Sequence, residues 1–486
     1  MSSFISLYFF IFLPVVVLFN FVIPRKFRYI WLFVTSICFY GSIDLGSTIV
    51  LALVILLTYG AALLLEKSDE GKRKLVLTGS LIVTIGTLVV FKYLGFIVGT
   101  FKGLTGGDAS DSAIKLLAVT GISFYMLKAI GYLIDVYRED IQAERNVVKY
   151  ALFVSFFPQI LSGPIERAGK MLPQFTYPLT VDYDRLRDGL FQMLWGYFLK
   201  MVIADRLSIY VAGVYSNPAG AVGFTAFMAT IFYTFEIYCD FAGYSHIAIG
   251  MARILGIDVM KNFESPYLSG SIAEFWRRWH ISLSTWFRDY LYIPLGGNRK
   301  GTVRKYLNVL IVFAVSGLWH GADWTFVFWG FLHGVYQVIG YLLRPVRDFL
   351  VDTFKVERRA FSHRLIKIVV TFLLVNYAWV FFRASSMAQA FAVIKNSLVF
   401  TPWQIMDQSL YSYGLTRLDF LVAILGIMLV ILVDIANYYG IIVREKIMSQ
   451  GIWVRYLIGL VGVLIILILG IWGPGYDAGS FIYQQF

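Results

Sequence analysis

Cysteine and charge are both scarce in this chain of 486 residues. Charged residues make up 15% of it and hydrophobic residues 58%, whereas about a quarter of an ordinary soluble domain is charged. The two cysteines, Cys38 and Cys239, lie far apart in apolar surroundings, so they build neither a disulfide framework nor a cysteine-based zinc site. The composition excludes a soluble enzyme, and we expect no redox chemistry and no metal site.

Several common catalytic motifs are also missing. The sequence has no Gly-x-Ser-x-Gly elbow, no phosphate-binding loop that ends in Gly-Lys-Ser/Thr and no His-Glu-x-x-His pair. Residues 296–301 are rich in glycine and basic residues, but they follow Pro294 rather than a strand, which predicts a turn at the membrane surface.

Apolar runs of bilayer length recur from end to end of the chain instead. Because about 20 residues of helix cross the hydrocarbon core, they predict an all-α polytopic membrane protein with roughly a dozen transmembrane helices. The runs are residues 4–23, 29–43, 48–65, 75–101, 114–136, 148–161, 190–214, 224–238, 303–318, 324–343, 365–382, 418–435 and 456–472.

Basic residues exceed acidic ones, with 42 Lys and Arg against 30 Asp and Glu and a formal net charge of +12. In a membrane chain this excess is typical of cytoplasmic loops, so we expect membrane lipid and no nucleic acid as a partner. The first apolar run ends in the basic stretch 24–28, the reverse of a secretory signal peptide. We expect it to remain as a helix, with the amino terminus outside.

Two stretches do not fit a simple bundle of spans. Residues 162–167 break helical continuity between apolar flanks, and residues 262–302 mix aromatic, basic, glycine and proline residues. Irregular backbone near membrane depth survives only where protein or a water-filled cavity satisfies its polar groups. Both stretches therefore predict re-entrant or interfacial segments beside an internal site.

Three of the five histidines have plain structural interpretations. His363 lies in a basic loop, where we expect solvent or headgroup contact. His246 and His333 lie in apolar stretches, and we expect each to be buried and hydrogen-bonded to a neighbour.

The other two histidines are candidates for chemistry. His280 stands in the segment 274–290, which is rich in Trp and Arg; this pattern is typical of the membrane interface, and the guanidinium groups also suit a phosphate-bearing donor. His320 stands where two apolar runs join, among small residues that permit close helix approach. A reference pKa of about 6.5 lets such an imidazole accept a proton near neutral pH.

The segment FWRRWHISLSTWFRDYLYIPLGG (275–297), followed by GLWHGA (317–322), resembles the membrane-bound O-acyltransferase family. YCDFAGYS (238–245) and ISFY (122–125) resemble its bacterial alginate O-acetylation branch. The similarity extends to residues 163–165 and 481–486. Two departures, His246 in place of an acidic residue and Cys239 in place of an aromatic one, bear on acceptor choice.

The resemblance implies that about a dozen helices ring a central tunnel, which the acyl donor enters from the cytoplasm and the acceptor from outside. His320 matches the family's essential histidine, the general base, and His280 matches its second signature position. The residues expected to bind the donor are Trp276, Arg277, Arg278, Ser282, Arg288, Asp289, Tyr290 and Asn298. Those expected to line the tunnel are Asp240, Tyr244, Trp319 and Trp324.

The resemblance further implies acetyl-CoA as the donor, with no bound cofactor, in a bacterial inner membrane. The acceptor is an extracytoplasmic polysaccharide, reached directly or through a periplasmic SGNH-like or esterase-like transferase. We expect one membrane domain, 1–486, with amino-terminal helices (1–160), a signature core (161–345) and carboxyl-terminal helices (346–486).

Other functions remain open at this point. D-alanyl or other acyl transfer to teichoic acid or peptidoglycan is compatible with the same motifs. In a different class, intramembrane histidines and Asp240 are compatible with a proton-coupled transporter. A structural subunit of an export complex has no positive feature in its favour.

Overall fold

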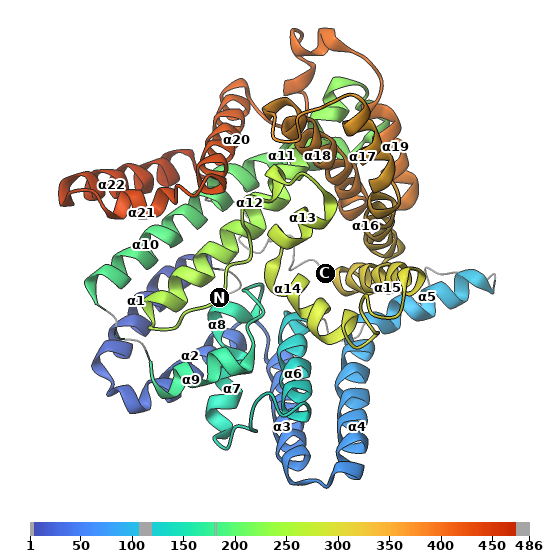
Figure 1. Cartoon of the computed structure of the whole chain (residues 1–486). Helices are drawn as coiled ribbons and strands as arrows, with labels where there is room; N and C mark the ends of the chain where they lie inside the picture. Colours follow the sequence, from blue (N-terminus) through green and yellow to red (C-terminus); the bar gives the residue numbers. More distant parts are fainter. Residues whose placement is uncertain (1–3, 106–118, 179, 181, 473–486) are drawn as a thin grey trace. The chain divides into compact units, whose positions relative to one another are not determined.

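The computed structural model describes residues 4–105, 119–178, 180 and 182–472. Within these ranges the chain forms helices and loops and no strand (Figure 1), which confirms the all-helical prediction. Contacts divide it into two compact units: the first contains the described residues of Met1–Met193 and Tyr244–Met260, and the second those of Leu194–Gly243 and Lys261–Tyr476. The single domain expected over the whole chain stays a prediction, and residues 481–486 lie outside the described ranges.

Three long helices of the first unit, α3, α4 and α6, pack against one another (Figure 1). α3 begins at Leu45 because the Asp44 carboxylate accepts a hydrogen bond from the Ser47 backbone N–H and caps the helix. The helices of this unit are α1 (Leu7–Val22), η1 (Arg25–Phe27), α2 (Arg28–Gly41), α3 (Leu45–Lys67), α4 (Glu70–Leu88), η2 (Val89–Tyr93), α5 (Leu94–Leu104), α6 (Ile122–Tyr137), α7 (Val147–Ser155), α8 (Phe157–Ile160) and α9 (Ala168–Thr176), with parts of α10 (Tyr183–Tyr197) and α12 (Phe224–Ile254).

The apolar run 148–161 does not form the single helix expected from the sequence. It divides at Phe156 into α7 and α8, which have 9 and 4 residues. Pro158 explains the break, because its ring would clash with the carbonyl of Val154 in a continuous helix and it has no N–H to donate. α8 and the residues of α7 from Tyr150 onward are buried, and both pieces are too short to span a bilayer.

The predicted break at residues 162–167 is confirmed: this buried segment is not helical. A side chain at Gly163 would place its Cβ 2.4 Å from the Gln159 Cα, so only glycine fits this turn. Glu166 accepts a hydrogen bond from the Met260 backbone N–H at 2.7 Å, which satisfies both groups inside the unit.

The second unit contains the other irregular stretch. Residues 262–302 form short helices joined by turns, which confirms that they interrupt the run of long helices; their re-entrant or interfacial placement stays a prediction. The helices of this unit are η4 (Phe198–Ala204), α11 (Asp205–Ser216), η5 (Pro218–Gly220), η6 (Pro266–Leu268), α13 (Ile272–Arg278), α14 (Ile281–Phe287), η7 (Arg288–Tyr292), α15 (Thr302–His320), α16 (Trp324–Leu342), α17 (Arg344–Thr353), α18 (Phe361–Arg383), α19 (Met387–Ser397), η8 (Pro402–Ile405), η9 (Ser409–Tyr411), α20 (Arg417–Tyr438), α21 (Val443–Met448) and α22 (Ile452–Leu469), with the rest of α10 and α12.

Helices α15 and α16 approach each other through glycines. A Cβ on Gly317 would lie 2.3 Å from the Phe326 carbonyl oxygen, and one on Gly330 would lie 2.2 Å from the Phe313 carbonyl oxygen. Small residues thus permit the close helix approach that the sequence predicts beside His320.

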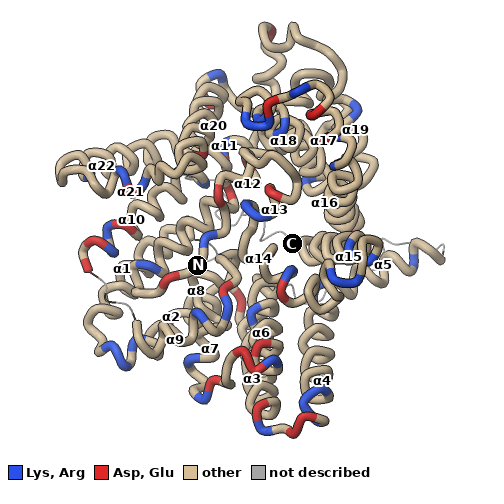
Figure 2. Tube along the Cα trace, in the orientation of Figure 1, with Lys and Arg blue, Asp and Glu red and all other residues tan. Residues whose placement is uncertain are grey.

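The length and apolar composition of its helices identify the chain as a multi-pass membrane protein. Five described helical segments are long and apolar enough to cross a membrane, and the bent pair α16 and α17 makes a sixth. The five are Leu45–Lys67, Glu70–Leu104, Phe361–Arg383, Arg417–Tyr438 and Ile452–Leu469. Figure 2 shows charged residues gathered near helix ends and loops, as expected where apolar helix interiors lie in lipid. The larger number of spans and the tunnel stay predictions.

Candidate active site

The two candidate histidines lie close together in the second unit. His320 is the last residue of α15, His280 caps the start of α14, and their ring centroids are 6.3 Å apart. Both side chains are at least 98% buried. Forty residues of chain separate them, so the folding of residues 262–302 against α15 creates this pair.

The turn between α15 and α16 fixes the position of His320. Gly321 has an extended backbone, and a Cβ there would lie 2.2 Å from the Phe326 ring. Asp323 then caps α16, because its side chain accepts a hydrogen bond from the Thr325 backbone N–H at 2.8 Å. The position of His320 at the end of α15 is therefore fixed by the short, tightly packed connection to α16.

His280 adopts a left-handed backbone conformation, with φ 44° and ψ 52°. For a residue other than glycine this conformation costs of order 1–3 kcal/mol and persists where surrounding contacts hold it. Asn262 provides two: its carbonyl accepts the Ile281 N–H at 2.9 Å, and its side-chain oxygen accepts the Ser282 N–H at 3.2 Å. Burial lowers the pKa of His280, which lies outside the candidate spans, to about 3, so its ring is neutral near pH 7.

Aromatic rings enclose both imidazoles. The centroid of the His320 ring lies 4.9 Å from that of Trp319, 5.0 Å from that of Trp329 and 5.4 Å from that of Phe382. The ring of His280 lies 4.6 Å from Phe241 and 6.1 Å from Trp319. Trp319, which the sequence predicts as a tunnel residue, therefore contacts both histidines.

Three tryptophans in this enclosure were not predicted. Trp279, Trp329 and Trp379 are fully buried and stack on or tilt against one another, with centroid distances of 5.0 and 5.3 Å. Their indole N–H groups have no acceptor among the described residues. A buried donor without an acceptor calls for an explanation, and an oxygen of a bound substrate is one. They come from three separate helical regions, so no local sequence pattern groups them.

The predicted donor residues on α13 have different surroundings. Arg277 is exposed, whereas Arg278 forms an ion pair with Glu274 at 3.0 Å and donates to the Glu264 carbonyl at 3.1 Å. The Trp276 Nε1–H donates to His333 at 3.2 Å. Arg278 and Trp276 are therefore held by protein partners, whereas Arg277 is exposed.

The remaining predicted donor residues follow along the same stretch. Ser282 is buried, and its hydroxyl has no partner among the residues described. Arg288 pairs with Asp289 at 2.8 Å, and Tyr290 packs against Trp286 at 5.0 Å.

Asn298 is exposed in the turn formed by residues 296–301, where three glycines have positive φ. This turn is the one predicted from the glycine-rich sequence after Pro294, and the structure confirms it.

The other predicted tunnel residues do not share one environment. Asp240 is buried and forms an ion pair with Lys200 Nζ at 2.7 Å, and the same Nζ pairs with Asp205 at 2.7 Å. Trp324 is 55% exposed at the start of α16, and Tyr244 packs against Phe4 in the first unit. Lys200 was not predicted as a site residue. The signal was available in the sequence, because a lysine inside the apolar run 190–214 predicts a buried charge with an acidic partner.

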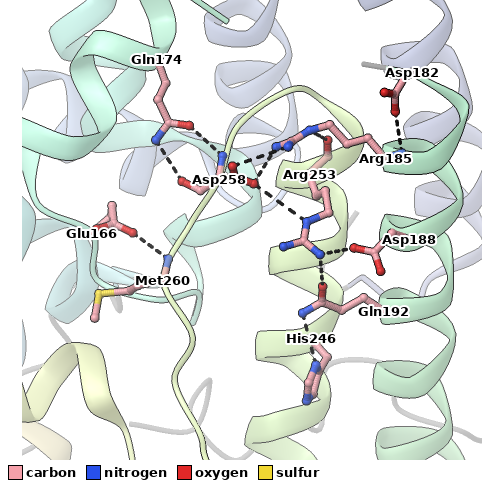
Figure 3. A network of polar contacts seen from close by, with 10 residues as sticks. All are labelled: Glu166, Gln174, Asp182, Arg185, Asp188, Gln192, His246, Arg253, Asp258 and Met260. Carbon is pink, nitrogen blue, oxygen red and sulfur yellow. Dashed lines mark hydrogen bonds and ion pairs between the residues drawn. The ribbon is translucent and has the colours of Figure 1, made fainter. Parts of the chain in front are cut away.

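The plain interpretation of His333 as a buried, hydrogen-bonded residue is confirmed; that of His246 is confirmed only in part, because His246 has a neighbour but is half-buried. His333 accepts the hydrogen bond from Trp276. His246 contacts Gln192 through Nδ1 at 3.4 Å (Figure 3). Gln192 also bonds to Arg253 of α12, which pairs with Asp188 of α10.

The same network reaches α9 through Asp258 (Figure 3). Arg185 binds the Asp258 carboxylate at 2.6 Å, and Gln174 exchanges two hydrogen bonds with the Asp258 backbone. Each of these polar groups has a protein partner, so the network joins α9, α10 and α12 within the first unit.

A family model for the membrane-bound O-acyltransferase family matches residues 141–387, a range that contains both histidines. A probable alginate O-acetylase AlgI of Azotobacter vinelandii is 34% identical, over 90% of this chain and 85% of that protein. A peptidoglycan O-acetyltransferase of Helicobacter pylori is 33% identical, over 80% of this chain and 78% of that protein. A teichoic acid D-alanyltransferase of Bacillus subtilis is 26% identical, over 60% of this chain and 75% of that protein.

Proposed function

Because the chain belongs to the membrane-bound O-acyltransferase family, we propose that this acyltransferase moves an acetyl group from cytoplasmic acetyl-CoA across the membrane for O-acetylation of an extracytoplasmic polysaccharide. The names of two relatives, alginate O-acetylase and peptidoglycan O-acetyltransferase, support the acetyl group and the polymer acceptor. The observation that carries the proposal is the buried pair His280 and His320, 6.3 Å apart inside one aromatic enclosure.

In the proposed reaction His320 is the general base. It takes the proton of an acceptor hydroxyl as that oxygen attacks the thioester carbonyl carbon; the C–S bond breaks, and the imidazolium returns the proton to the departing coenzyme A thiolate. His280, neutral and held by Asn262, orients the donor. A positioned general base contributes about 10²–10⁴-fold to such a step.

The buried indole groups supply the electrostatic part of the proposal. As the oxygen attacks, the carbonyl oxygen gains negative charge, and preorganised N–H donors stabilise it most in a water-excluded site. Trp329 is the best placed of the three tryptophans, since its ring contacts His320 directly.

The donor enters, in this proposal, over α13, α14 and η7. The exposed guanidinium groups of Arg277 and Arg288 contact its phosphates, while Arg278 acts as a positioning residue through Glu274. Ser282 offers its buried hydroxyl to the donor. Trp276, Asp289, Tyr290 and Asn298 complete the donor segment.

The wider setting is also a proposal. About a dozen helices surround a tunnel lined by residues such as Asp240 and Trp319, in a bacterial inner membrane with the amino terminus outside. The acceptor is reached directly or through a periplasmic SGNH-like or esterase-like transferase. D-alanyl transfer is the second candidate function, because one relative is a teichoic acid D-alanyltransferase.

Inside-out membrane vesicles test the function. Labelled acetyl-CoA is added outside them, and label on an acceptor inside the lumen is measured for the parent chain and for His320→Ala. We expect about a hundredfold loss or more in the variant, with unchanged amounts of folded protein. Equal transfer by the two chains refutes the proposal, and transfer only from a D-alanyl donor selects the second candidate. A His320-dependent proton flux without transfer identifies a transporter.

A further inference from the structure

The second unit contains a pocket of about 350 Å³ away from the two histidines. It lies where the loop before α18 and the start of α18 meet the end of α20 and the segment around α13. Its lining is strongly basic. The residues that line it are Leu268, Gly270, Glu274, Arg358, Arg359, His363, Arg364, Lys367, Ile368 and Tyr438.

Three of the four arginine and lysine side chains that line this pocket are not neutralised by neighbouring carboxylates within the described ranges. Arg358 binds both Asp348 and Asp352 at 2.9 Å, so its charge is compensated. In contrast, Arg359, Arg364 and Lys367 form no ion pair with any part of the chain that the structure describes. Three positive charges therefore face one cavity, and an anion is the missing partner.

The pocket has an ordered wall rather than only flexible surface cations. The Arg364 guanidinium lies 4.4 Å from the centre of the Tyr438 ring, and that of Arg278 lies 4.6 Å from the same centre. The single carboxylate of the lining, Glu274, accepts hydrogen bonds from the Gly270 N–H and from Arg278 at 3.0 Å. Its charge is thus compensated, and Arg364 is held on an aromatic platform.

The position of the pocket matches the membrane–water interface. It lies where one candidate span, α18, begins at Phe361 and where another, α20, ends at Tyr438. In the same part of α18, Ile366, Val369 and Val370 expose apolar side chains. His320 contacts Phe382, which is about 22 Å further along α18 from Lys367. The pocket is therefore separate from the aromatic enclosure.

We propose that this pocket binds a phosphate-bearing anion at the membrane surface. Arginine guanidinium groups form paired hydrogen bonds with phosphate oxygens, and basic pockets between membrane helices take anionic headgroups. Two sources have this chemistry: the headgroup of an anionic phospholipid, whose acyl chains would lie on the exposed apolar side of α18, and the phosphates of coenzyme A. His363, for which solvent or headgroup contact was expected from the sequence, lines this site.

Binding to the full-length chain in detergent tests the proposal. Affinity is measured for phosphatidylglycerol and, separately, for coenzyme A. The test variant is Arg359→Gln/Arg364→Gln/Lys367→Gln. The control, Arg347→Gln/Lys355→Gln/Lys395→Gln, removes the same charge from residues outside the pocket.

We expect the test variant to weaken binding of one probe about tenfold or more and the control to change it less than about threefold. Loss confined to phosphatidylglycerol identifies a lipid site, and loss confined to coenzyme A identifies a donor site. Equal effects of the two variants on both probes overturn the proposal. These readouts do not require acyl transfer, so they stand apart from the His320 assay.

Discussion

The indole of Trp329 stands edge-on against the imidazole of His320, with ring centroids 5.0 Å apart and an interplanar angle of 89°. This contact joins α16 to the end of α15, and the glycines that let those helices touch make it possible. Helix packing and the proposed chemistry therefore depend on the same few residues.

Replacing Gly330 should disturb that packing. In Gly330→Ala the new Cβ would lie 2.2 Å from the Phe313 carbonyl oxygen, so the helices must separate. We expect a loss of about 1–3 kcal/mol in the free energy of unfolding, seen as a lower melting temperature. Gly340→Ala on the same helix is the control, because nothing lies within 4 Å of its Cβ; an equal loss there would contradict the packing argument.

Trp329→Phe should test the role of the indole N–H. The change keeps an aromatic ring beside His320 but removes an N–H that has no acceptor among the described residues. We expect kcat, measured per amount of folded protein, to fall about tenfold or more, since oxyanion donors contribute about 10²–10³ in established cases. The smaller ring leaves a cavity at a fully buried position, so we also expect a lower melting temperature. A variant with full kcat would remove Trp329 from the proposed chemistry.

The left-handed backbone at His280 should decide which replacements fold. Asparagine visits this conformation readily, whereas a β-branched residue does so rarely. We expect His280→Asn to keep most of the stability and to lose activity, and His280→Val to lose about 1–3 kcal/mol more in unfolding free energy. Equal stability of the two variants, measured by thermal unfolding, would show that this backbone conformation carries no constraint.

The Lys200 ion pairs should matter far more than exposed ones. Lys200→Met leaves Asp205 and Asp240 buried without their cation, and breaking a buried pair costs about 3–5 kcal/mol. The matched change, Arg288→Met, breaks an exposed pair with Asp289 and should cost under about 1 kcal/mol. Unfolding in detergent compares them, and similar losses would argue against a structural role for Lys200.

The sequence predicts well what depends on composition and on short patterns. The all-helical class, the break at 162–167 and the turn after Pro294 follow from apolar runs, glycine and proline, and the structure confirms each. The choice of His280 and His320 as catalytic candidates came from a family resemblance rather than from any spacing, and their separation of 6.3 Å is a finding of the structure.

What the sequence did not predict depends on contacts between distant segments. Trp279, Trp329 and Trp379 come together only when α13, α16 and α18 pack. Trp324 was expected from the family resemblance to line a tunnel, yet it lies exposed at the start of α16. Apolar runs indicate burial or lipid contact without distinguishing them, which is why 148–161 resembled a span.

Chemical rescue of His320→Ala in acetyl transfer is the most direct test of the central claim. The account predicts that the variant loses about a hundredfold or more in the transfer rate and that added imidazole restores part of it, because a free imidazole replaces the missing base. Full transfer by the variant without imidazole would contradict the claim that His320 takes the acceptor proton.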